Sequence, residues 1–254
     1  MDHVTTSMEA SRWAGLKLPG QNELPCDDGE PMETSYHVAQ NAVLVDALHF
    51  NRDECPDCYV ATNMFVYFSE QQIKRNDFRG PDVFVVLDAD RTPRKSWVAW
   101  EEGGRLPDVV IEITSESTAH VDRGEKMRIY SRIWRTPAYF IFDPETEKLE
   151  GYRLDVDRLE YVAIEPDERG DLPVAPLGLA LGLRRTRFRD FDRLFVRWIA
   201  PDGSPLPLPE EALNSERSRA EQERSRAESA DAERERALER VRELEQQLAA
   251  LKKR

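Results

Sequence analysis

The segment LPDVVIEITSES, residues 106–117, combines the β-branched residues of a buried strand with two acids, Asp108 near its start and Glu112 in its middle. Burying a charged carboxylate costs free energy unless it is protonated, paired or bound to a metal ion. We therefore expect Glu112 to have a partner. Asp108 faces the same side of a regular strand, but it lies about 13 Å away, which is too far to share one metal ion.

Asp82 is a better candidate partner, because it begins the preceding apolar segment, GPDVFVVLD. Strands that follow one another in sequence are often antiparallel neighbours, so the beginning of one lies beside the end of the next. This pairing places Asp82 beside Glu112. It places Asp108 at the opposite end, near Asp88 or Asp90.

Two carboxylates on adjacent strands form an oxygen-rich site that suits Mg²⁺ or Mn²⁺. Such an ion can lower the pKa of a bound water and stabilise charge on a transferring phosphate. A cation that balances the phosphate is also needed, but Thr114 stands two residues after Glu112, where a lysine would share its face. Lys126 on the following helix could reach Glu112 instead, or it could pair with Asp122 on the helix surface.

Apolar periodicity and turn residues predict the elements that position these side chains. The order of elements favours an α/β or α+β fold with a mixed sheet. The predicted helices are residues 33–50, 119–134 and 189–199, and the predicted strands are 59–68, 81–88, the opening segment, 137–144, 149–154 and 158–165.

Cysteine usage fits a reducing compartment, since three cysteines are too few for a disulfide framework. Cys55 and Cys58, with Cys26 and His49 nearby in sequence, show only half of a zinc or redox pattern, so we expect a plain loop between helix and strand, with a zinc site or a redox pair as the alternative. The sequence has neither an apolar run long enough to span a bilayer nor the order of a signal peptide. We expect a cytoplasmic protein without membrane contact.

The organisation along the chain suggests four parts. Residues 1–31 are a loose lead-in, 32–200 a globular domain, 201–209 a proline-rich linker and 210–254 a long helix. The helix could form a coiled coil that makes the protein a homo-oligomer, or it could be a solitary charged helix held by ion pairs four residues apart. Its apolar seam is best developed at Val241, Leu244, Leu248 and Leu251.

The net charge of −13 argues against a broad positive surface of the kind that usually binds nucleic acid. Residues 209–254 hold 12 acidic and 11 basic side chains, so nearly all of the excess negative charge lies in the first 208 residues. Local basic segments remain, such as LRRTRFRD at residues 183–190.

Four segments follow one another along the chain: DGEPMETSYH, GPDVFVVLD, LPDVVIEITSES and PAYFIFDP. Their order resembles that of the Uma-two family of restriction-endonuclease-like bacterial domains in the PD-(D/E)XK nuclease superfamily. The resemblance covers roughly residues 29–165. It implies a restriction-endonuclease-like core with a mixed central sheet flanked by helices, a divalent metal ion and hydrolysis of phosphodiester bonds.

Position by position, Asp82 matches the acid of the second core strand of this family and Glu112 the acid of the third. Thr114 stands where the superfamily has a lysine, and Lys126 matches a lysine displaced to the next helix. Asp108, in the second Pro-Asp step, is a further candidate ligand.

Two residues of the first predicted helix also match the family. Glu33 resembles a helix-borne acid of some superfamily members, with a surface residue as the alternative. His37 matches a helix histidine, and a structural histidine between helix and sheet is the alternative.

Three functions follow from these patterns. The first is a Mg²⁺- or Mn²⁺-dependent DNA endonuclease in which Asp82 and Glu112 hold the ion, Lys126 stabilises the phosphate charge and the coiled coil joins two active sites. The alternative is a non-catalytic scaffold with a nuclease fold, which recruits a partner through the coiled coil. A nuclease for small or structured nucleic acids is the third.

Overall fold

The computed structural model describes residues 19–24, 34–69, 80–115 and 118–251. Glu33, Cys26 and most of the predicted lead-in lie outside these residues. The chain divides into two compact units, residues 1–207 and 208–254. Among the described helices, none combines the length and the apolar character that crossing a membrane requires.

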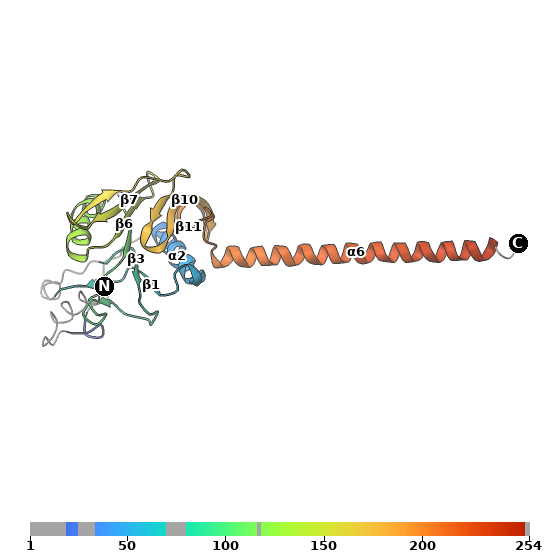
Figure 1. Ribbon diagram of the computed structural model, residues 1–254, viewed down its shortest axis with the longest axis horizontal. Helices are drawn as coiled ribbons and strands as arrows, with labels where there is room; N and C mark the ends of the chain where they lie inside the picture. The colour runs from blue at the N-terminus through green and yellow to red at the C-terminus, as the bar shows by residue number, and fades with distance from the viewer. Residues whose placement is uncertain (1–18, 25–33, 70–79, 116–117, 252–254) are drawn as a thin grey trace. The chain divides into compact units, whose positions relative to one another are not determined.

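A six-stranded mixed sheet with the order β1-β3-β5-β6-β7-β8 forms the centre of the first unit (Figure 1). β5 and β6 run parallel, and the other neighbours in this sheet run antiparallel. The expected α/β fold with a mixed sheet is confirmed. The strands are β1 (Cys58–Thr62), β3 (Val83–Leu87), β5 (Val109–Ile113), β6 (Ala138–Asp143), β7 (Lys148–Asp155) and β8 (Glu160–Ala163).

The antiparallel pairing predicted between the two acid-bearing strands is present. Val83 pairs with Ile111 and Val85 with Val109, so the register continues toward Asp82 and Glu112 at the next position. Because side chains alternate along a strand, Glu112 shares its sheet face with Val110.

A helical segment connects β5 to its parallel neighbour β6, as a parallel crossover requires. The sequence predicts one regular helix here, whereas the structure has two π-helical turns within it. The Tyr130 and Trp134 side chains pack on the face of the sheet that bears Val110 and Tyr139. In order, the pieces are α4 (Ala119–Val121), η2 (Asp122–Lys126), α5 (Met127–Ile129) and η3 (Tyr130–Trp134), of which η2 and η3 are π-helical.

Helix α2 (Ser35–Phe50) contacts β1, β3 and the later strand β11. It begins after Thr34, whose hydroxyl accepts a hydrogen bond from the His37 backbone N–H at 3.3 Å, a typical N-cap. Its apolar side chains, including Val43 and Leu44, are fully buried.

A second, three-stranded antiparallel sheet replaces the helix predicted at residues 189–199, and that prediction is wrong. Phe191, Phe195 and Trp198 have helical spacing, but a two-residue turn at Arg189 and Asp190 reverses the chain and pairs this segment with the strand before it. Burial on both faces of the strand produces an apolar pattern that imitates a helix. The strands are β9 (Leu172–Val174), β10 (Leu179–Phe188) and β11 (Phe191–Ile199), with η4 (Ala175–Leu177) between β9 and β10.

The strand predicted at residues 59–68 is divided in two. Asn63 adopts a left-handed conformation with φ of 50°, after which β2 (Val66–Tyr67) pairs with β4 (Trp97–Val98) in a separate small sheet. Cys55 and Cys58 form a disulfide in the loop after α2, beside η1 (Arg52–Glu54), so the prediction of a plain loop with reduced cysteines is incomplete.

Most of the predicted linker packs as part of the first unit. The Ala200 N–H bonds to the Ser204 carbonyl oxygen, and the Leu206 N–H to that of Trp198, each at 2.8 Å. The Leu206 side chain is buried. In this proline-rich segment the chain therefore turns back and pairs with the end of β11.

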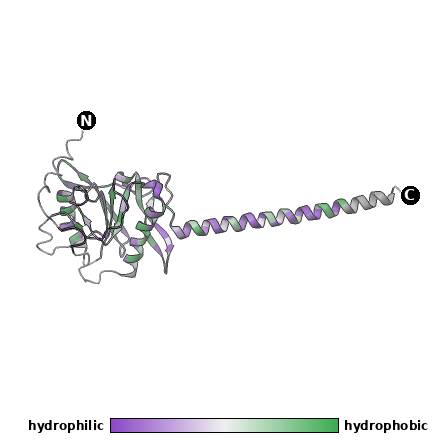
Figure 2. Ribbon diagram, turned by 90° about the horizontal axis from the view of Figure 1, so that it is seen from below, coloured by the Kyte–Doolittle hydropathy of each residue, from purple (hydrophilic) through white to green (hydrophobic). Residues whose placement is uncertain are grey.

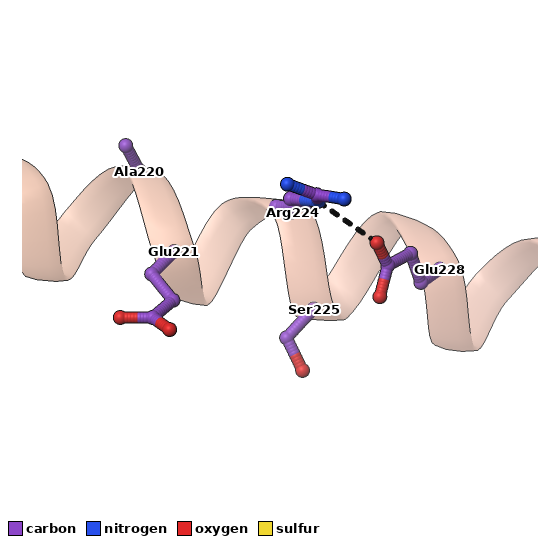
Figure 3. A pocket seen from close by; sticks show the side chains of 5 residues that line it. All are labelled: Ala220, Glu221, Arg224, Ser225 and Glu228. Atoms are coloured by element: carbon purple, nitrogen blue, oxygen red, sulfur yellow. Dashed lines mark hydrogen bonds and ion pairs between the residues drawn. The ribbon is translucent and has the colours of Figure 1, made fainter.

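The second unit contains one uninterrupted helix of 43 residues, α6 (Pro209–Leu251). Hydrophilic residues dominate much of its length (Figure 2), and Leu213 and Val241 are about half exposed at 48% and 50%. Arg224 and Glu228 form an ion pair at 2.9 Å, one turn apart (Figure 3). Exposed pairs of this kind stabilise an isolated helix by about 0.3–0.5 kcal/mol each.

Candidate active site

Glu112 is fully buried, and both of its carboxylate oxygens have hydrogen-bond donors. Oε1 accepts from the Tyr130 hydroxyl at 2.7 Å. Oε2 accepts from Lys126 Nζ at 2.9 Å and from the Asp82 backbone N–H at 3.3 Å. The charge that interrupts the apolar strand is therefore paired with a cation and held in a fixed orientation.

Asp82 and Glu112 exchange hydrogen bonds across the end of the β3–β5 pair. The backbone N–H of Asp82 points to the Glu112 side chain, and the backbone N–H of Ile113 donates to Asp82 Oδ2 at 2.6 Å. Each carboxylate thus accepts a hydrogen bond from a backbone N–H at the end of the other strand, where a carbonyl oxygen would accept it in a regular sheet. The structure brings these two carboxylates to one edge of the sheet, and as the acids of the candidate site they are here called the active-site acids.

Lys126 satisfies both arrangements that its sequence position left open. Its Nζ atom lies 2.9 Å from Glu112 Oε2 and 3.0 Å from Asp122 Oδ1, and the Asp122 side chain is itself only 3% exposed. Lys126 and Asp122 stand at the two ends of π-helical η2. Isolated π turns occur frequently at functional sites.

Charge balance fixes the protonation state of Lys126. Burial alone would lower the pKa of its ammonium group, but the carboxylates of Glu112, Asp122 and Asp82 outweigh this effect and raise the pKa above its usual value. Lys126 is consequently a cation throughout the neutral pH range.

Two tyrosines complete the buried cluster. Burial and the Glu112 carboxylate hold the pKa of Tyr130 well above its ordinary value, so its hydroxyl remains a donor to Glu112. The same two causes, burial first, raise the pKa of Tyr139, whose hydroxyl donates to the Asp122 carbonyl oxygen at 2.9 Å.

His37 reaches the same edge of the sheet from α2. Its Nε2 lies 3.1 Å from the Ile113 carbonyl oxygen, and its Nδ1 lies 2.8 Å from Thr34 Oγ1. A carbonyl oxygen only accepts hydrogen bonds, so Nε2 carries a proton. Ile113 thereby links His37 to Asp82, because its carbonyl oxygen accepts a hydrogen bond from His37 and its N–H donates one to Asp82.

Thr114 follows the cluster but adds no charge to it. Its side chain is fully buried, its N–H bonds to the Phe142 carbonyl oxygen at 2.8 Å, and its hydroxyl lies 3.4 Å from the Thr118 hydroxyl. Lys126, rather than residue 114, supplies a positive charge to Glu112.

Asp108 is not brought to this cluster. At the other end of β5 its Oδ2 accepts from the Leu87 N–H at 2.8 Å, which extends the β3–β5 ladder. Burial raises the pKa of Asp108; the Leu87 hydrogen bond lowers it in part, and the nearby Asp88 carboxylate raises it further. The geometry indicates a structural position.

Sequence reasoning missed two members of the cluster. Tyr130 is absent from the predicted site, and Asp122 is predicted only as a surface partner of Lys126. The spacing of Asp122, Lys126 and Tyr130, four residues apart in succession, places them on one helix face and is the signal that was available.

The family resemblance implies a divalent metal ion at this site. No group of three or more His, Cys, Asp or Glu residues suited to a metal ion occurs within the described part of the chain. Two adjacent carboxylates nevertheless suit Mg²⁺, which often binds through one or two protein carboxylates and completes its coordination with water and substrate phosphate. The active-site acids therefore fit such an ion by the type of their donor atoms.

The mixed sheet, the crossover helix and the paired acids on neighbouring strands belong to one α/β domain. The model of the Uma2 family, described as "Putative restriction endonuclease", matches residues 16–187, and the chain belongs to this family. The resemblance noted in the sequence is confirmed.

Among solved structures, the chain is similar to a protein from Anabaena variabilis described as a "putative nuclease belonging to DUF820". The two share 17% sequence identity with a TM-score of 0.42, over 61% of this chain and 88% of the other. No curated protein matches the chain.

Proposed function

We propose that this protein is a Mg²⁺- or Mn²⁺-dependent endonuclease that hydrolyses DNA phosphodiester bonds. The observation that carries the proposal is the pair of active-site acids, which two adjacent strands hold beside one partly buried lysine. Family membership supports the nuclease class.

Asp82 and Glu112 would hold the ion at the edge of the sheet. When bound there, a divalent ion lowers the pKa of a water molecule and offsets negative charge on the phosphate. The Tyr130 hydroxyl and the Ile113 N–H each fix one carboxylate, so neither acid must reorient when substrate arrives.

Lys126 serves as a fixed positive charge in this proposal. Its raised pKa keeps it protonated at neutral pH, so it is unsuited to act as a general base and is suited to stabilise charge that develops on the phosphate. Asp122 would keep Lys126 in an ion pair while Glu112 also binds the metal ion. His37, through the Ile113 carbonyl oxygen, positions the end of β5.

Residues 210–254 would join two copies through a parallel coiled coil and so supply one active site for each DNA strand. The support is the apolar seam near the C-terminal end of the sequence and the continuity of α6 through it.

Nicking of supercoiled plasmid in Mg²⁺ or Mn²⁺ tests the proposal. Wild-type protein should nick the plasmid, whereas Glu112→Gln and Asp82→Asn should each lose at least about 100-fold in rate, a typical cost of removing an electrostatic contributor to the transition state. Glu168→Gln, which alters an exposed acid in a turn, is the matched control and should retain the wild-type rate.

Equal nicking by the wild-type and Glu112→Gln proteins would show that a contaminating enzyme cuts the plasmid. Absence of nicking, together with absence of Mn²⁺ binding, would favour the scaffold function. Cleavage of single strands or RNA alone would move the substrate from duplex DNA to those nucleic acids.

A further inference from the structure

The β10–β11 hairpin concentrates positive charge in a chain whose net charge is −13. Residues 184–193, here called the arginine hairpin, contain five arginines against two aspartates. The function proposed above requires contact with phosphates and assigns no role to these residues. The five are Arg184, Arg185, Arg187, Arg189 and Arg193.

Contacts of Arg193 fix the turn end of this hairpin beside the active-site edge of the sheet. Its Nη2 donates to the Pro144 carbonyl oxygen at 2.9 Å, directly after β6 ends. The end of β6 lies next to the end of β5, because the Thr114 N–H bonds to the Phe142 carbonyl oxygen. The hairpin therefore approaches the edge that holds Glu112.

Tyr36 provides a second and independent link. The Arg193 guanidinium lies 4.2 Å from the centroid of the Tyr36 ring, and the Tyr36 hydroxyl donates to the Leu194 carbonyl oxygen at 2.6 Å. The next residue, His37, contacts the Ile113 carbonyl oxygen, and the Ile113 N–H contacts Asp82. A short chain of contacts thus connects the hairpin to the active-site acids.

Not all of the arginines are equally available to a ligand. Arg184 is paired with the buried Asp171 at 2.7 Å, and Arg185 with Asp192 at 2.9 Å. Arg187 and Arg189 are exposed near and at the turn.

Arg189 is held in a defined place. It adopts a left-handed conformation with φ of 52° in the two-residue turn, and its guanidinium lies 5.1 Å from the centroid of the Phe188 ring. An arginine fork held in this way binds phosphate oxygens in a bidentate manner with little further loss of side-chain entropy.

The helical connection between β5 and β6 also carries arginines, but acids oppose two of them. Arg123 is paired with Glu150 and Arg132 with Glu160, each at 3.0 Å. The charge of the arginine hairpin is better placed for a polyanion, since it lies at the active-site edge.

We propose that the arginine hairpin binds the phosphodiester backbone of DNA through Arg187 and Arg189 and so directs the strand toward the active-site acids. This inference rests on the proposed nuclease function and names its DNA-contacting element. Contacts to phosphates carry most of the affinity of non-specific binding and make it dependent on salt. A protein that is acidic overall can bind DNA through such a local surface.

The test is fluorescence anisotropy with a labelled duplex of arbitrary sequence and the full chain, in EDTA, at salt concentrations between about 50 and 200 mM. The double variant Arg187→Glu/Arg189→Glu should bind at least about tenfold more weakly at low salt. The slope of log affinity against log salt should become shallower by about 2, the loss of two phosphate contacts.

Arg153→Glu/Arg158→Glu is the matched control, because it reverses two exposed arginines at the opposite end of the sheet, where Arg153 pairs with Ala138 at the start of β6. This control should keep the wild-type affinity and slope. Thermal melting of each variant establishes that it is folded, and Arg187→Gln/Arg189→Gln replaces the double variant if charge reversal prevents folding.

Wild-type affinity in a folded hairpin variant would overturn the inference, as would an equal loss in both double variants or a wild-type protein that does not bind DNA. Plasmid nicking judges the nuclease function separately. A hairpin variant that nicks with a raised KM and a kcat within about twofold of wild type supports the inference. Such a result means that the lost contacts bind the substrate and the transition state equally.

Discussion

Lys126 Nζ lies 2.9 Å from Oε2 of Glu112, a carboxylate that has no solvent exposure. Breaking a buried ion pair by removing one partner costs about 3–5 kcal/mol, because the other charge remains buried without compensation. This relationship couples the stability of the domain to its proposed chemistry.

Lys126→Met should therefore lower the free energy of unfolding by about 3–5 kcal/mol, as measured by urea denaturation. The double variant Lys126→Met/Glu112→Gln should recover part of that loss, since one of the two uncompensated carboxylates is neutralised. A double variant that loses the sum of the two single effects would show that the pair is not energetically coupled.

The penalty of Lys126→Met should not shrink as the pH rises from about 6 to 9. Because the folded pKa of Lys126 is raised, its contribution to stability is fully present below its unfolded pKa of about 10.4 and is lost only as the pH rises through the higher folded pKa. Denaturation of both proteins at the two pH limits measures the difference. A penalty that shrinks toward pH 9 would contradict the raised pKa.

Asp108→Asn should leave the protein equally stable at pH 7, or up to about 1 kcal/mol more stable. The folded pKa of Asp108 is raised, so its ionised form opposes folding once the pH has risen through that value, and asparagine still offers an oxygen to the Leu87 N–H. The stability difference should shrink as the pH falls through the folded pKa of Asp108 toward its lower unfolded pKa. Loss of plasmid nicking in this variant would assign Asp108 a role in catalysis instead.

Two copies of the chain should associate through α6. Light scattering coupled to gel filtration should give the mass of an oligomer for the wild-type protein and that of a monomer for Val241→Asp/Leu248→Asp, because charges at the seam oppose its burial. Glu233→Asp, which alters an exposed acid of α6, is a control that should remain oligomeric. A monomeric wild-type protein would support the solitary helix.

The pairing of β3 with β5 could be predicted because it depends on simple rules. Strands alternate their side chains, sequential strands are often neighbours, and Glu112 in an apolar run requires a partner. These rules are sufficient to place Asp82 beside Glu112 and to separate both from Asp108.

The remaining parts depend on interactions that a single sequence does not display. The two π turns of the crossover helix could not be predicted, because the same residues are compatible with a regular helix. The β10–β11 hairpin was obscured because Phe191, Phe195 and Trp198 have a helical spacing, while the turn at Arg189 that decides the topology contains neither glycine nor asparagine.

The central claim is that Asp82 and Glu112 together hold the catalytic metal ion. Isothermal titration of Mn²⁺ into the full chain in the absence of DNA measures this most directly, with Asp82→Asn, Glu112→Gln and the control Glu168→Gln titrated in parallel. The wild-type and control proteins should bind Mn²⁺, and each of the other two variants should lose at least about tenfold in affinity. Equal Mn²⁺ affinity in all four proteins, or no binding by the wild-type protein, would contradict it.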